Sequence, residues 1–386
     1  MPPRRTRNGG SVGTRASVEP LFQSKSKSQS PEETKKLIPI IASPPTTPRS
    51  PTTTAQLSTT TSTTSTTVTT TTKSKLRKSE GDEVWLASKL PRPLLFPTVL
   101  LLSFALSSGA YTLVAPHLAE LGGVSRKVDT WWGVWGVVLW RGFELALGWF
   151  GNFDSYDLVS LSLVSRGPVL YLLHAFYNIS PQPLLLSLLI DTTTASLPFY
   201  LIRALSPAHS TNSSNLPNKD LLTDTQIQSF TTLLATTIYA VTLSTAYNTY
   251  LTTSLAVHFN NLPTIISAYS ASPVTLFPLC LPLGLAVKSF IFTPATTASS
   301  ENRREFDPTT ATLSETFWYN VWGWDIRTKT VIARTVALML VSGGSTFVQS
   351  FVSLEGVEAQ GAIAYAGVWV FAALVTGTAL GVAGAV

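Results

Sequence analysis

Residues 94–115 read LLFPTVLLLSFALSSGAYTLVA, a run of 22 residues without one charged side chain. About 20 apolar residues in a helix are enough to cross the hydrocarbon core of a bilayer, which is about 30 Å thick. This run therefore predicts a transmembrane helix.

The composition of the whole chain agrees with a membrane protein. Of the 386 residues, 45% are hydrophobic and only 12% are charged, whereas soluble domains carry roughly 25% charged residues. The charges are also segregated, because residues 1–93 carry a formal net charge of +9 and the remainder carries −3. This pattern excludes a soluble globular enzyme, a secreted disulfide-bonded domain and a plain nucleic-acid binder, so no nucleic acid is expected as a partner.

Further apolar segments follow the first, and together they predict an all-α, polytopic membrane domain over residues 94–386. We expect a bundle of about eight transmembrane helices that lies in a lipid bilayer. Pro278 and Pro282 predict a kink in the sixth helix. The predicted spans are 94–115, 131–150, 157–177, 183–205, 229–252, 273–293, 331–353 and 361–385.

Residues 1–93 form a basic tail rich in Ser, Thr and Pro, and residues 52–72 are almost entirely Ser and Thr. Such a segment has too little apolar surface to offset the entropy of ordering. We therefore expect a disordered tail, with a role in recruiting cytosolic partners. The Arg-rich start resembles a mitochondrial presequence in composition, but Pro2 and Pro3 oppose the helix that a presequence forms. An endomembrane or the plasma membrane is therefore favoured over mitochondria.

The distribution of Lys and Arg between the loops predicts the orientation. With eight spans and the tail in the cytosol, the basic loop 294–330 is also cytosolic, and loop 253–272, which has no Lys or Arg, lies on the opposite side. Arg126 and Lys127 in loop 116–130 are the exception. The excess of Lys and Arg in the loops on the side of the tail predicts that the N and C termini are both cytosolic.

Motifs for catalysis and metal binding are missing from the sequence. The single cysteine, Cys280, lies in an apolar run, and the four histidines are widely spaced. There is no HExxH pair, no phosphate-binding glycine loop and no GxSxG elbow. We therefore expect no catalytic residue, no metal, no cofactor and no enzymatic activity.

Four ionisable residues fall near the centres of three consecutive predicted spans: Arg141 and Glu144, Arg166, and Asp191. A central Arg or Asp costs about 2.5–3.5 kcal/mol on insertion scales, so four unpaired charges would cost on the order of 10 kcal/mol. We therefore expect Arg141 to pair with Glu144, and Arg166 with Asp191. Two hypotheses stay open: a network that fixes helix packing, or a path for a substrate or proton.

Small residues mark two of the last spans. Ser342, Gly343, Gly344, Ser345 and Thr346 lie at the middle of the seventh span. They predict either a broken helix that offers backbone groups to a ligand or close helix packing. In the eighth span, Gly377 and Gly381 form a GxxxG motif, which predicts tight helix packing or contact in a homo-oligomer.

Five short runs form a recognisable pattern: Trp140–Phe150, Asp154–Leu158, Leu197–Phe199, Tyr319–Gly323 and Ser353–Glu358. Together they resemble an uncharacterised family of fungal multi-pass membrane proteins without an assigned activity. The resemblance covers residues 94–386 and implies that the membrane region is one unit and the tail a variable addition.

Two functional hypotheses follow from these observations. In the first, the protein is a carrier or channel-like protein for a small solute or ion and uses the four midplane charges. In the alternative, it is a non-catalytic membrane scaffold or assembly factor whose tail recruits partners. No motif supports an intramembrane enzyme.

Overall fold

The computed structural model describes residues 91–127, 131–210, 218–298, 312–314, 316–317 and 325–383. All of them belong to one unit, Lys75–Val386. The predicted disordered tail lies outside the described residues except for its last three positions.

Each of the eight predicted spans falls on a long helix. These helices are α2 (Arg92–Val114), α4 (Trp131–Phe150), α5 (Ser155–Ala175), α6 (Pro181–Ile202), α8 (Thr225–Ala246), α11 (Pro273–Thr297), α13 (Ile326–Val348) and α14 (Ala359–Ala383). Two of them continue through a π-helical turn, α8 into η2 (Tyr247–Leu251) and α9 (Thr252–His258), and α13 into η3 (Gln349–Ser353). The short elements are η1 (Ala115–Leu118), α3 (Ala119–Val124), α7 (Lys219–Thr223) and α10 (Ile266–Tyr269).

Among the described residues, six helical segments are long and apolar enough to cross a membrane, so length and composition do not confirm eight spans. The two predicted spans that fall short are α4 and α8. Five of the 20 residues of α4 are Trp and two are charged, while seven of the 22 residues of α8 are Thr, and both compositions lower the hydropathy. The six segments are Arg92–Val124, Ser155–Ala175, Pro181–Ile202, Pro273–Thr297, Ile326–Ser353 and Ala359–Ala383.

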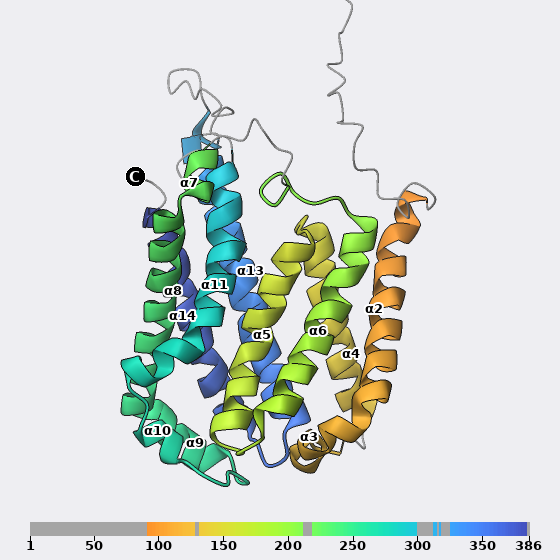
Figure 1. Ribbon diagram of the computed structural model, residues 1–386, viewed down its shortest axis with the longest axis vertical. Coiled ribbons are helices and arrows are strands. Elements are labelled where there is room, and N and C mark those ends of the chain that lie inside the picture. Colours follow the sequence, from red (N-terminus) through yellow and green to blue (C-terminus); the bar gives the residue numbers. More distant parts are fainter. Residues whose placement is uncertain are drawn as a thin grey trace, which may run out of the picture. The chain divides into compact units, whose positions relative to one another are not determined.

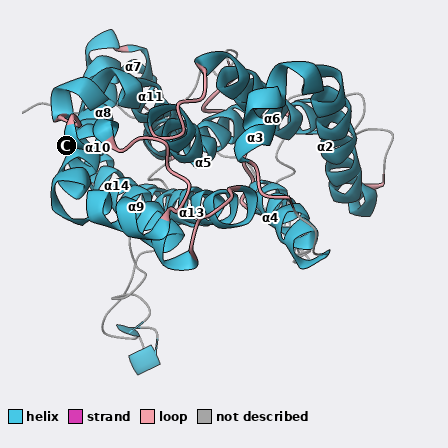
Figure 2. Ribbon diagram, turned by 90° about the horizontal axis from the view of Figure 1, so that it is seen from below, coloured by secondary structure: helices cyan, strands magenta, loops and turns pink. Residues whose placement is uncertain are grey.

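Successive long helices run in opposite directions (Figure 1), so the start of α2 and the end of α14 lie at the same end of the bundle. We call this end the terminal end. The opposite end, where α3, α9 and α10 lie, is the loop end. The view from the loop end shows α2 at the edge of the bundle, next to α6 (Figure 2). In α11, which contains Pro278 and Pro282, the first half bends away from the rest (Figure 1).

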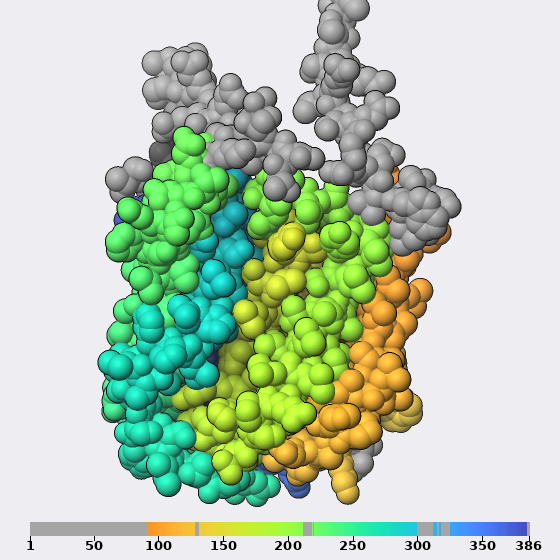
Figure 3. Space-filling model, viewed as in Figure 1, coloured from red at the N-terminus to blue at the C-terminus, as the bar shows by residue number. Residues whose placement is uncertain are grey.

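Two hydrophobic cores of unequal size hold the bundle. The larger one lies among α5, α8, α11, α13 and α14 and includes the fully buried side chains of Tyr239, Phe290 and Trp369. The smaller one joins α2 and α4 to α5 and α6, and its buried residues are Val99, Leu145, Leu158, Phe199 and Ile202. Helices α2, α6, α5 and α11 pack side by side on the face seen in Figure 3. Because the smaller core has few residues, the side of the bundle formed by α2 and α4 depends more on polar contacts.

Backbone hydrogen bonds connect the loops at the loop end. The segment after η3 pairs with residues on both sides: Leu354 bridges to Ser125, and Val357 bridges to Phe259. Between them, Gly356 adopts φ +77°, which an L side chain rarely tolerates. This segment lies in the Ser353–Glu358 run that contributes to the family resemblance, and its role here is to hold the ends of three helical segments together.

The small residues of α13 and α14 serve helix packing. The α-helix α13 is continuous through Ser342–Thr346, so the broken helix considered for these residues is absent. A Cβ at Gly344 would collide with the indole ring of Trp140 on α4, and one at Gly343 would collide with Val370 on α14. The small residues of this segment allow α4 and α14 to pack closely against α13, and α13 itself stays helical.

The two glycines of α14 pack within the chain. A Cβ at Gly377 would collide with Thr335 on α13. A Cβ at Gly381 would lie 3.1 Å from Cγ1 of Val331, which is also on α13. The GxxxG face is therefore covered by α13 and offers no support for the predicted homo-oligomer contact.

The fit between Gly344 and Trp140 yields a test. Gly344→Leu is expected to destabilise the protein by about 1–3 kcal/mol, the usual cost of overpacking. The matched control is Gly367→Leu on α14, because nothing lies within 4 Å of a Cβ at Gly367. Thermal unfolding in detergent should show a lower melting temperature for Gly344→Leu than for Gly367→Leu. Equal melting temperatures would show that the close approach of α13 and α4 is not required.

Candidate functional site: an intramembrane charge network

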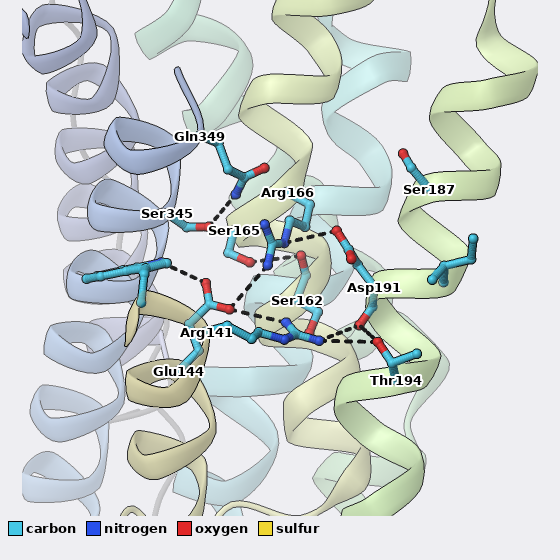
Figure 4. Close-up of polar contacts among 12 residues, drawn as sticks. Arg141, Glu144, Ser162, Ser165, Arg166, Ser187, Asp191, Thr194, Ser345 and Gln349 are labelled. Carbon is cyan, nitrogen blue, oxygen red and sulfur yellow. Dashed lines mark hydrogen bonds and ion pairs between the residues drawn. The ribbon is translucent and has the colours of Figure 1, made fainter. Parts of the chain in front are cut away.

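The structure brings the four charged residues that were predicted at the span centres together near the middle of α4, α5 and α6. Glu144 lies 3.2 Å from Arg141 on its own helix and 3.3 Å from Arg166 on α5. Arg166 in turn lies 3.3 Å from Asp191 on α6. Figure 4 shows the four side chains pointing toward one another. Both expected pairs are present, and the additional contact between Glu144 and Arg166 joins them into one network.

Neutral groups add hydrogen bonds to the network. The Trp140 indole N–H donates to Glu144 at 3.0 Å, and the Tyr111 hydroxyl donates to Asp191 at 2.9 Å. Arg141 donates to the backbone carbonyl of Asp191 at 3.0 Å. Since Tyr111 belongs to α2, the network connects four helices.

The network is electrically neutral, with two guanidinium groups and two carboxylates. Each charged side chain has an oppositely charged partner within 3.3 Å. Glu144 accepts from Trp140, Arg141 and Arg166, which satisfies both of its oxygens. Buried ion pairs need good geometry and additional hydrogen bonds to offset the cost of desolvation, and Glu144 has such hydrogen bonds at both oxygens.

Sequence patterns did not identify Tyr111 or Trp140 as members of the network. Trp140 belongs to a group of tryptophans at the start of its span, which is typical of interfacial anchors. Its spacing of four residues from Glu144 places both on one helix face and was a usable signal. Tyr111 lies 80 residues from Asp191, and no local pattern connects the two.

At the terminal end, a second polar cluster fixes the turn between α4 and α5. Asp154 and Asp157 form a capping box at the start of α5. Both oxygens of Asp157 accept from Arg334 on α13, at 2.7 and 2.9 Å. Arg203 donates to the carbonyls of Gly148, Trp149 and Phe153, which caps the end of α4. The acidic turn thus fixes the connection between α4 and α5 and joins it to α13.

Asp154, Asp157 and His209 lie close enough to share a metal ion, with candidate ligand atoms within 4.8 Å of one another. The donors do not fit this role, because Arg334 already occupies both oxygens of Asp157 and places a positive charge beside them.

Burial raises the pKa of Asp154, but hydrogen bonds with His209, the Asp157 N–H and Ser206 hold that pKa well below its usual range. Such a carboxylate stabilises the fold above about pH 4, and its contribution declines as the pH falls further.

Comparison with known protein families gives a match over part of the chain. Residues 224–377 match the family model described as the bouquet formation protein 3 C-terminal domain. The matched part extends from the start of α8 into α14 and is less than half of the chain, so it does not include the network on α2, α4, α5 and α6. This similarity is consistent with the resemblance to an uncharacterised fungal family. No curated protein and no solved structure matches the chain.

Compensation between Arg141 and Glu144 is the first test of the network. Either single change to Leu leaves an unbalanced charge in the network and is expected to cost about 3–5 kcal/mol, with reduced abundance in the membrane. The pair Arg141→Leu and Glu144→Leu leaves Arg166 with Asp191, so abundance and melting temperature should recover.

The control for this experiment combines Arg141→Leu with Glu358→Leu. Glu358 lies at the loop end beside His258, so the total charge change is the same but the network stays unbalanced. Recovery in the control as well as in the network pair, or no loss in the single variants, would contradict the pairing.

Proposed function

We propose that this protein is a non-catalytic membrane scaffold whose helical unit anchors a cytosolic recruiting tail. The observation that carries this proposal is the pairing of all four midplane charges across α4, α5 and α6, to which Tyr111 of α2 is hydrogen-bonded. A network in which every charge is already matched is suited to holding helices in register.

The alternative hypothesis, a carrier or channel-like protein, has less support. The unbroken course of α13 through Ser342–Thr346 removes one feature that transporters use to bind substrates. The similar family domain is named for the formation of a bouquet, and that name refers to neither a reaction nor a transported solute. Both observations favour the scaffold.

The tail provides the recruiting function in this proposal. Residues 1–93 carry a net charge of +9 and long Ser/Thr-rich stretches, and the basic group Lys73, Lys75, Arg77 and Lys78 precedes the first span. Chains of this composition bind partners without a packed core of their own. The basic group adds attraction to an anionic cytoplasmic leaflet.

We also propose that α4 and α8 cross the membrane, which gives eight spans and cytosolic N and C termini. A 20-residue helix such as α4 is about 30 Å long, equal to the hydrocarbon core. In Figure 1 both helices extend along their neighbours and connect the two ends of the bundle. An endomembrane or the plasma membrane remains the proposed location.

Cysteine accessibility tests this topology, since Cys280 is the one cysteine of the chain and is fully buried. In a Cys280→Ala background, single cysteines at Asn261 and Glu355 report on the loop end, and one at Arg303 reports on the stretch of sequence that joins α11 to α13. A membrane-impermeant maleimide added from the cytosolic side should label Arg303→Cys only. Labelling of Asn261→Cys or Glu355→Cys from that side in sealed membranes would contradict eight spans.

Two variants with opposite expected outcomes test the scaffold. A biotin ligase fused to the C terminus reports the proteins near each variant. Replacing residues 1–72 by a scrambled sequence of equal composition should remove a discrete set of neighbours. The Arg141→Leu and Glu144→Leu pair, at normal abundance, should keep that set. Unchanged neighbours after the tail is scrambled, or their loss in the network pair, would overturn the proposal.

A further inference from the structure

A cavity of about 510 Å³ lies directly beside the charge network. It is lined by α2, α3, α4, α5 and α6 and by the end of α13 with η3, and it extends from Arg166 in the middle of α5 to Leu354 at the loop end. Small-molecule sites in proteins have volumes of about 300–1,000 Å³, so this cavity is large enough for a ligand.

One end of the cavity is polar. Tyr111, Arg141, Arg166 and Asp191 line it, and Gln349 and Ser187 lie beside them. The side chains of Arg141, Arg166 and Asp191 are 12%, 14% and 18% exposed, compared with 7% for Glu144. Part of the network is therefore within reach of a molecule in the cavity, while its centre at Glu144 is covered.

The remaining walls of the cavity are mostly apolar. Leu121 of α3, Leu170 and Leu173 of α5, and Leu188 of α6 form much of this surface, together with Val348 of α13. An apolar space of this size favours an apolar occupant over water, because water needs two to four polar partners. A ligand that fits both parts is an amphiphile with its polar group at the network.

The charge balance of the network decides which polar group fits. Two guanidinium groups and two carboxylates already neutralise one another, so a ligand with a net charge would leave an unpaired charge at the centre of the membrane. A hydroxyl group brings no charge. It is able to donate to Asp191 or to the Tyr111 oxygen and to accept from Arg141 or Arg166.

From these observations we propose that the cavity binds an uncharged, hydroxyl-bearing lipid, with the hydroxyl at Tyr111, Arg141, Arg166 and Asp191 and the apolar body along the leucine-lined wall. An uncharged head also suits the depth of the site, since desolvating a hydroxyl costs far less than desolvating an ion. Sterols and diacylglycerols share this chemistry. The inference does not depend on the scaffold proposal, because it requires only the cavity and its lining.

Photoaffinity labelling of the full chain in membranes tests the proposal. The probes are a sterol and a diacylglycerol, each with a free hydroxyl, a diazirine and an alkyne, and a fatty acid with the same reactive groups and a free carboxylate. At least one hydroxyl probe should label the protein saturably and be displaced by its unmodified parent lipid. Which of the two is displaced identifies the source. The fatty acid should show no displaceable labelling.

Adjacent leucines on α6 provide matched variants. Leu188 lines the cavity, whereas Leu189 is 60% exposed on the outer surface of the bundle. Leu188→Trp fills the site and should reduce the displaceable labelling by about tenfold, while Leu189→Trp should leave it unchanged. Equal labelling of the two variants would overturn the proposal.

Mapping the label in the unmodified protein keeps the test independent of whether Leu188→Trp folds. Labelled peptides should come from α2, α5 and the 348–354 segment, which line the cavity. Label confined to outward-facing residues of α8 and α14, or equal labelling by all three probes without saturation, would assign the signal to bulk lipid and contradict the site.

Discussion

The pairing of buried charges is the interaction on which the side of the bundle formed by α2 and α4 depends. Four such charges occur in α4, α5 and α6, and each is matched within 3.3 Å by an opposite charge. Glu144 accepts from Arg141 on its own helix and from Arg166 on α5. The network therefore couples α4 to α5 in addition to pairing the two charges of α4 with each other. The Tyr111 hydroxyl extends the same network to α2.

The need to pair these charges affects how the helices around the network pack. The larger core is formed among α5, α8, α11, α13 and α14, whereas α2 and α4 contribute to a small core only. In α4, the described residues that are buried are Glu144, Leu145 and Gly148. The helix is thus held by the network, by the indole of Trp140 against Gly344, and by the cap that Arg203 makes on its last carbonyls. The polar end of the cavity is formed by the same network, so packing and ligand binding share these residues.

The sequence predicted the long helices well because uncharged runs of about 20 residues have few alternatives to a helix in a membrane. It also predicted the two charge pairs, since an unpaired charge there is costly. Among the described residues, length and composition support six spans and not eight, because the tryptophans of α4 and the threonines of α8 lower the hydropathy of these two helices. Contacts formed by tertiary packing were not predictable. No local sequence pattern connects Tyr111 to Asp191, and the indole ring that packs against Gly344 belongs to Trp140 on another helix. The interrupted helix considered for Ser342–Thr346 is absent because the same small residues serve close packing.

A double-mutant cycle on Glu144 and Arg166 measures the central claim most directly, since these residues form the contact between α4 and α5. Glu144→Gln, Arg166→Gln and the pair are compared by unfolding in mixed micelles. If the network holds α4 to α5, the coupling free energy is about 1 kcal/mol or more, within the range found for residues in one ion-pair network. Additive effects, with a coupling free energy near zero, would contradict the account.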